Sequence, residues 1–152
     1  MAFFSTGLTS IVIPASVKFI GAGAFTWNAL FRWGSRLASI TVDDRNTEYS
    51  SIDGVLFNKD KTILIQYPAD KDNKTYVIPS SVTVIEENSF YGCNNLEKII
   101  IPTSVITIGA SAFDDCISLK TVLISRNIRF DRYTFPRRAE IIYIEAIDNA
   151  LR

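Results

Sequence analysis

The strongest constraint on the fold is a segment that occurs three times, each copy opening with an Ile-Pro pair. The copies begin at Ile13, Ile78 and Ile101, and each continues with a Ser-Val pair, an isoleucine and a phenylalanine. The last two copies are 23 residues apart, as Phe90 and Phe113 show. A constant offset across many positions indicates one structural unit copied in tandem.

Each copy is preceded by a short segment with apolar residues at alternate positions, as in Leu96-Glu-Lys-Ile-Ile-Ile. This spacing is typical of a strand with one buried face. One unit of this size cannot cover that face alone, whereas stacked units can. We therefore predict a leucine-rich-repeat solenoid, a β-rich right-handed stack of about five to six coils with short helical or 3₁₀ turns and an inserted β-hairpin near Gly54.

The combined pattern LxxIxIPxSVxxIGxxAFxxCxxL resembles the BspA-like class of leucine-rich repeat, found in surface proteins of bacteria and protists. The DGVLFNKD segment around Gly54 resembles the longer unit in which a hairpin interrupts the regular coils. The resemblance covers residues 8–144. It implies a cell-surface or secreted location and an adhesion or binding role toward a protein or peptide, with host and extracellular-matrix proteins as candidate ligands.

We predict that residues 1–152 form a single leucine-rich-repeat domain. The predicted repeat units are 8–36, 37–74, 75–95, 96–118 and 119–138, followed by a partial last strand at 139–145 in which Ala139 takes the leucine position. Open strand edges at the two ends of such a stack invite pairing, so end-to-end self-association is a further prediction.

Composition argues against an enzyme. The chain has no histidine, and its two cysteines are too few for a disulfide framework or a four-cysteine metal site. We therefore assign no catalytic residue, no metal and no cofactor. The formal net charge is zero and no apolar run is long enough to cross a bilayer, so neither nucleic-acid binding nor membrane insertion is expected.

Three other features receive structural interpretations. Cys93 and Cys116 occupy equivalent sites, where parallel side chains hold Cβ atoms at about 4.8 Å, so buried free thiols are favoured over a disulfide. The acidic loop beginning at Asp43 lacks the pattern of a calcium loop and is interpreted as solvated. Glycine follows the second isoleucine at Gly21 and Gly109, but Glu86 takes this place in the third copy, so a positive φ is not required there.

A local excess of positive charge lies near the end of the chain, where the regular copies carry serine or threonine. A solvated end coil is the favoured interpretation, and contact with phosphate or an acidic partner is the alternative. The arginines concerned are Arg126, Arg129, Arg132, Arg137 and Arg138.

An insertion of six residues in the first unit supplies one candidate binding surface. It lies between Phe25 and Leu37 and carries the aromatic residues Trp27, Phe31 and Trp33. Insertions in a solenoid emerge on one face, and tryptophan is enriched in binding hot spots. The alternative is a turn whose aromatic rings fold back over the edge of the coil.

The outward side chains of the predicted strands supply a second candidate surface. Four consecutive positions, Val77, Ile100, Leu123 and Tyr143, are apolar or aromatic and would form a stripe about 15 Å long. Exposed apolar stripes mark interaction surfaces, so we predict that this face binds a protein or peptide. The alternative is a second layer that covers the stripe.

The leading functional prediction is a non-enzymatic protein-binding or adhesion module. A structural spacer within a longer surface protein is the alternative, and an enzyme-associated accessory domain is the least favoured. An enzyme would need converging carboxylates in a deep pocket, whereas a spacer would show no exposed apolar surface.

Overall fold

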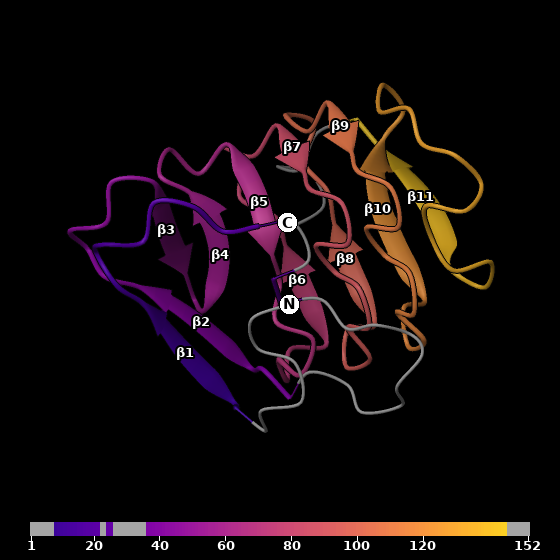
Figure 1. Ribbon diagram of the computed structural model, residues 1–152. Coiled ribbons are helices and arrows are strands. Elements are labelled where there is room, and N and C mark those ends of the chain that lie inside the picture. The colour runs from indigo at the N-terminus through magenta and orange to yellow at the C-terminus, as the bar shows by residue number, and fades with distance from the viewer. Residues whose placement is uncertain (1–7, 22–23, 26–35, 146–152) are drawn as a thin grey trace.

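The computed structural model describes residues 8–21, 24–25 and 36–145. Their strands are β1 (Ser10–Ile13), β2 (Ser39–Val42), β3 (Tyr49–Ile52), β4 (Val55–Asn58), β5 (Ile63–Gln66), β6 (Thr75–Val77), β7 (Val84–Ile85), β8 (Lys98–Ile100), β9 (Thr107–Ile108), β10 (Thr121–Ser125) and β11 (Glu140–Ile144). Figure 1 shows them succeeding one another along a stack from β1 to β11. Within the ranges given, no helix is long and apolar enough to cross a membrane.

Two ladders run along the stack (Figure 1). One contains the parallel strands β6, β8, β10 and β11, and the other contains β5, β7 and β9 in parallel with β3 and β4 added in antiparallel fashion. Residues 23 positions apart pair in both ladders, as Val77 does with Ile100 and Val84 with Thr107. The sequence repeat therefore sets the register of the ladders.

Phenylalanines from equivalent positions stack in the interior. The rings of Phe90 and Phe113 lie 4.8 Å apart, and those of Phe113 and Phe135 lie at the same distance. These distances match the strand spacing of about 4.8 Å, because each coil places one ring directly over the last. The prediction that Phe90 and Phe113 share equivalent surroundings is confirmed, and each ring pair adds about 0.5–1.5 kcal/mol beyond its burial.

The number of coils and the nature of the turns differ from the prediction. The chain forms a β-solenoid of about four turns rather than five to six. One reason is that β3, β4 and β5 fold back on one another instead of completing a regular coil. The described residues contain no helix. Single turns, each closed by a hydrogen bond from a backbone N–H to the carbonyl three residues earlier, as from Ser89 N to Glu86 O, lie where short helical turns were predicted.

The antiparallel pair β3–β4 turns at Asp53 and Gly54, both with positive φ. Positive φ at both central residues is typical of a type I′ turn, whose twist matches that of the two flanking strands. The turn lies against β2, since Ile40 N donates to Gly54 O at 2.8 Å. A Cβ on Gly54 would lie 2.6 Å from Ser39 Oγ, so glycine is required here by packing as well as by conformation.

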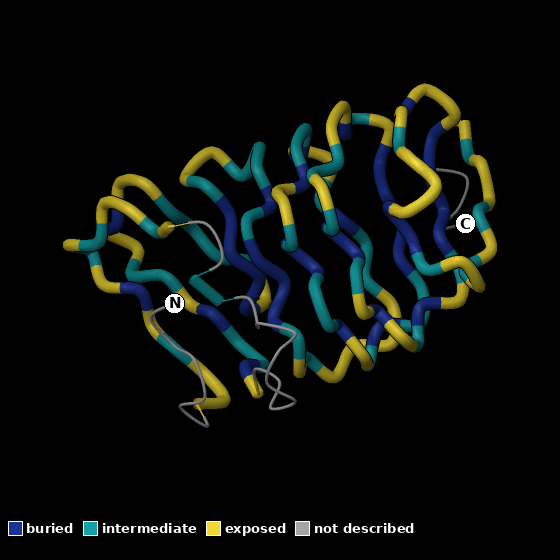
Figure 2. Tube along the Cα trace, turned by 45° about the vertical axis from the view of Figure 1, so that its right-hand side comes forward, coloured by how far each residue is buried: buried dark blue, intermediate teal, exposed yellow. Residues whose placement is uncertain are grey.

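Two apolar clusters fill the interior, and β4 contributes to both. Leu56 belongs to the cluster of the first coils with Ile13 and Ile40, whereas Val55 and Phe57 belong to the larger cluster. All three β4 side chains are fully buried. Alternate side chains of a strand point to opposite faces, so β4 separates the two clusters. Figure 2 shows the burial following the strands, with exposed residues at the turns.

The last coil is shorter than the one before it. The strand β11 pairs Glu140 with Thr121, so Arg138, not Ala139, takes the place of Leu119. The step from Leu96 to Leu119 is 23 residues and the step from Leu119 to Arg138 is 19. The prediction for Ala139 is therefore wrong by one position. The observed register places Ile141 beside the buried Val122, where its branched side chain packs against the core.

Candidate functional site

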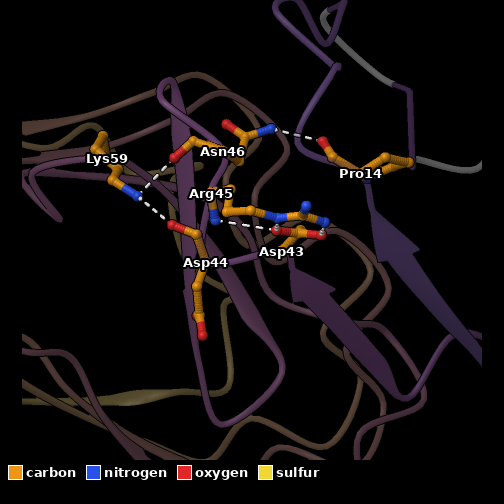
Figure 3. A network of polar contacts seen from close by, with 6 residues as sticks. All are labelled: Pro14, Asp43, Asp44, Arg45, Asn46 and Lys59. Atoms are coloured by element: carbon orange, nitrogen blue, oxygen red, sulfur yellow. Dashed lines mark hydrogen bonds and ion pairs between the residues drawn. The ribbon is translucent and has the colours of Figure 1, made fainter.

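The acidic loop after β2 is held by the protein's own cations (Figure 3). Lys59 Nζ donates to the carbonyl oxygens of Asn46 at 2.6 Å and Asp44 at 3.3 Å. Arg45 pairs with Asp43 at 2.8 Å, and this hydrogen bond holds the pKa of the carboxyl down at about 2. Across the described ranges, no group of three or more metal-ligating side chains is found. These contacts support a structural role for the loop.

Asn46 joins the first coil to the second. It is buried, and its Nδ2 donates to Pro14 O at 2.8 Å and Val17 O at 3.0 Å, as Figure 3 shows for Pro14. Its Oδ1 accepts from the backbone N–H groups of Glu48 and Tyr49. All hydrogen-bonding groups of the amide are satisfied, as a buried polar side chain requires. Asn46 therefore positions the segment that follows β1.

The two cysteines are buried free thiols, as predicted. The Cys116 thiol donates to Phe90 O at 3.0 Å, and Cys93 lies 3.8 Å from Tyr67 O. Burial raises the pKa of the Cys93 thiol well above its ordinary value, with the neighbouring Cys116 adding to the shift. A thiol that resists ionisation is a poor nucleophile, which argues against such a role for Cys93. Both cysteines are buried in the larger apolar cluster and serve the core.

The outward row on the β6–β8–β10–β11 ladder is not the exposed stripe predicted from the sequence. Val77, Ile100 and Leu123 do lie side by side, but Ile100 is 2% and Leu123 is 8% exposed. Neither belongs to the interior clusters, and their burial agrees with the alternative of a covering layer. Covering is the favourable outcome physically, because a continuous apolar row is costly to leave in water.

The end of the row also differs. The one-position shift of β11 places Ile142 beside Leu123, and Tyr143 beside Ile124. Tyr143 is 45% exposed, and the guanidinium of Arg126 lies 4.7 Å from its ring centroid. Val77 is half-buried, so the four predicted residues share no open surface.

The first coil carries an apolar surface that is open. Val12 is 69% exposed and Phe19 is 81% exposed. Both line a cavity of about 430 Å³ whose other walls include Ile11, Pro14 and Phe25. The segment after Pro14 is anchored to the second coil, since Ile20 N donates to the Tyr49 hydroxyl at 2.9 Å.

The aromatic residues of the insertion, Trp27, Phe31 and Trp33, lie outside the described residues. Phe25, the last described residue before them, lines the cavity of the first coil. Sequence reasoning did not select Phe19, although a signal existed. Phe19 occupies the position of Thr107 in the last copy, where a polar residue suits an exposed strand.

A leucine-rich-repeat solenoid with exposed apolar side chains on its first described coil is the class of protein that these features define. The sequence matches the BspA type leucine-rich repeat region in six copies, over residues 1–51 and 66–150. The chain belongs to this family. No curated protein matches it.

Solved structures support the same class. The pneumococcal vaccine antigen PcpA is 32% identical over 80% of this chain and 29% of its own, with a TM-score of 0.72. A leucine rich cell surface protein from Faecalibacterium prausnitzii A2-165 is 25% identical over 92% of this chain and 48% of its own, with a TM-score of 0.62. A leucine-rich repeat protein from Eubacterium ventriosum shows the fold at 24% identity over 90% of this chain and 48% of its own, with a TM-score of 0.58. The chain thus spans less than half the length of each.

Proposed function

We propose that this chain is a non-enzymatic protein-binding module of a cell-surface or secreted protein, and that its first coil recognises a protein or peptide ligand. The observation that carries this proposal is the open apolar surface around Val12 and Phe19 beside a cavity of about 430 Å³. The cell-surface location is supported by the likeness to a vaccine antigen and to a cell surface protein.

The energetic argument rests on the exposed phenylalanine. Burying one such side chain contributes roughly 1.5–3 kcal/mol, and Phe19 has most of its surface available. A rigid wall favours this gain, because Asn46 and Tyr49 already fix the segment that carries Phe19. In this proposal Trp27, Phe31 and Trp33 supply further contacts from the insertion that follows Phe25 in the sequence.

The test captures ligands from host and extracellular-matrix extracts on the immobilised protein, identifies them by mass spectrometry, and measures each purified ligand by biolayer interferometry. The double variant Val12→Ser/Phe19→Ser should lose ligand binding. The matched control is Ile106→Ser/Ile117→Ser, which replaces two apolar residues of similar exposure, 73% and 56%, in another part of the stack.

A second pair addresses the insertion. Trp27→Ala/Trp33→Ala should weaken the same ligand by about tenfold or more if the rings contribute contacts. Circular dichroism establishes that each variant is folded. Equal binding by the wild type and by both test pairs would refute the proposal and would leave the structural spacer as the better description.

A further inference from the structure

The strands β1 and β11 lie at opposite ends of the stack, as Figure 1 shows, and each is the edge strand of its sheet. In the part of the chain that the structure describes, β1 pairs with β2 alone and β11 pairs with β10 alone. Each of the two strands therefore has one side on which no described strand lies. An edge strand presents its backbone N–H and C=O groups on such a side, where they can pair with another chain.

The available backbone groups of β1 belong to its outward residues. Ile13 O accepts from Asp43 N, just after β2, at 2.9 Å. Backbone groups alternate between the two edges of a strand, so those of Ile11 and Ile13 face β2, and those of Ser10 and Val12 face the other way. The side chains of Ile11 and Ile13 belong to the smaller apolar cluster, whereas Ser10 and Val12 are exposed. The open edge of β1 is thus formed by residues that a second chain can reach.

The available backbone groups of β11 belong to its inward residues instead. Glu140 N donates to Lys120 O at 2.8 Å, so by the same alternation the N–H and C=O groups of Ile141 and Tyr143 face away from β10. The Ile141 side chain packs against the larger cluster, and Tyr143 lies beside the buried Ile124. Tyr143 is 45% exposed and Ile141 is partly exposed, so these groups too are within reach of a second chain.

The pairs within the stack show that these two edges are complementary. Ile78 N donates to Ile100 O at 3.0 Å, and Ile101 N donates to Leu123 O at 2.8 Å. In each case the donor is an inward residue at the end of the earlier strand, and the acceptor is an outward residue of the later strand. The edge of β11 offers the groups of an earlier strand, and the edge of β1 offers those of a later strand.

We propose that β11 of one copy of this chain pairs in parallel with β1 of a second copy and so joins the two stacks end to end. Val12 N of the second copy donates to Ile141 O of the first, and Tyr143 N of the first donates to Val12 O of the second. This register keeps inward side chains beside inward ones and outward beside outward, whereas a shift of one residue would reverse the faces. The side-chain neighbours are Ile141 with Ile11, Ile142 with Val12, and Tyr143 with Ile13.

The pairing removes exposed apolar surface from water at both ends of the stack. Val12 is 69% exposed and Ile142 is 39% exposed, and burying such surface favours association. Glu140, a charged residue of β11, comes to lie beside the uncharged Ser10, so no like charges oppose each other there. Because the contact joins two different edges, each added copy leaves a new edge of the same kind, and the assembly is open-ended.

This contact shares Val12 with the ligand surface proposed above but does not rest on that function. It forms between copies of the chain alone, through the backbone of β1. The variant Phe19→Ser separates the two proposals, because it removes the most exposed ring of the ligand surface and leaves β1 unchanged. It should lose ligand and still self-associate.

The test measures the average mass of the whole chain by sedimentation equilibrium as its concentration rises to about 1 mM. The mass of the wild type should rise beyond that of two chains. Val12→Lys and Ile142→Lys each place a charge on one edge, at exposed positions, and each should stay monomeric. The matched control Ile106→Lys changes a residue that is 73% exposed and outside both edge strands, and it should associate as the wild type does.

Mixing the two edge variants tests the head-to-tail direction. Val12→Lys keeps an intact β11 and Ile142→Lys keeps an intact β1, so an equal mixture should form a dimer with one chain of each and grow no further. A monomeric wild type at the highest concentration, self-association of either edge variant, or a mixture that stays monomeric would each overturn the proposal. A wild type that stops at two chains would also overturn it, because that result indicates a closed pairing of like edges.

Discussion

Replacing Gly109 with alanine tests how closely neighbouring coils approach one another. A Cβ at this position would lie 2.4 Å from Glu87 N, 2.7 Å from Glu86 C and 2.8 Å from Glu87 Cα. These are backbone atoms of the preceding coil, so no side-chain rotation relieves the contact. Gly109 N also donates to Ile85 O at 2.8 Å, and separating the coils would stretch this bond.

The expected destabilisation follows from two opposing effects. Forcing a methyl group into a packed contact costs about 1–3 kcal/mol. Alanine also lowers the entropy of the unfolded chain, which returns about 0.4–1 kcal/mol. Gly21 is the matched control, since a Cβ there would find only Phe19 Cε1, at 3.7 Å, among the described residues. Gly109→Ala should therefore be less stable than Gly21→Ala by about 2 kcal/mol.

Urea unfolding followed by far-ultraviolet circular dichroism measures this difference. With a slope of about 2 kcal/mol/M, the midpoint of Gly109→Ala should lie about 1 M below that of Gly21→Ala. A third variant, Gly109→Ser, should resemble Gly109→Ala because it adds a Cβ at the same point. Midpoints that agree for the alanine variants at positions 21 and 109 would refute the close-approach reasoning.

Three further outcomes are expected. The thiols of Cys93 and Cys116 should not react with Ellman's reagent in the native protein and should both react in concentrated urea, because both side chains are buried out of reach of the reagent; rapid reaction under native conditions would show that they are accessible. Asn46→Ala should lower the free energy of unfolding by about 3 kcal/mol, since it removes four partly buried hydrogen bonds worth about 0.5–1.5 kcal/mol each, and a loss below about 1 kcal/mol in urea titration would contradict this. Arg45→Ala should raise the pKa of Asp43 from about 2 toward its ordinary value in an NMR titration, and an unchanged value would show that Arg45 is not the cause; because the folded-state pKa is depressed, the stabilising contribution of this pair is present at neutral pH and is lost as the pH falls toward 2.

The repeat in the sequence predicts the pairing of the strands but not what covers them. Val77, Ile100 and Leu123 pair as the 23-residue offset requires, because register depends on the copies themselves. The exposure of Ile100 and Leu123 depends on more distant residues, which no local alternation encodes. The exposed Phe19 was detectable in principle as a departure from the threonine of another copy, whereas the cavity that it lines was not.

The end of the stack was the least predictable part. Ala-Glu-Ile-Ile at Ala139 resembles the Leu-x-x-Ile pattern, yet the strand pairs one position away and packs Ile141, rather than Ile142, beside Val122 on the core. The shortened coil also changes the backbone bonding: among the described residues, the N–H groups of Ser111, Phe113 and Asp115 make none of the inter-coil bonds that Asn88, Phe90 and Gly92 make one coil earlier. At Gly109 the sequence comparison excluded a conformational need correctly, but the steric need arises from a neighbour in space.

The strand β4 divides the interior of the stack into two separate apolar clusters, which makes this position a weak point under mechanical load. Leu56 packs in the cluster of the first coils and Phe57 packs in the larger cluster, so the first coils and the later coils do not share one continuous hydrophobic core. β1 and β2 form a sheet of their own, and the bonds from Ile40 N to Gly54 O and from Val42 N to Ser51 Oγ link β2 to the β3–β4 hairpin beside it. In a single-molecule force experiment that pulls along the stack, this junction should open first. The β1–β2 pair should then detach in one extension step, while the stacked rings of Phe90, Phe113 and Phe135 stay together.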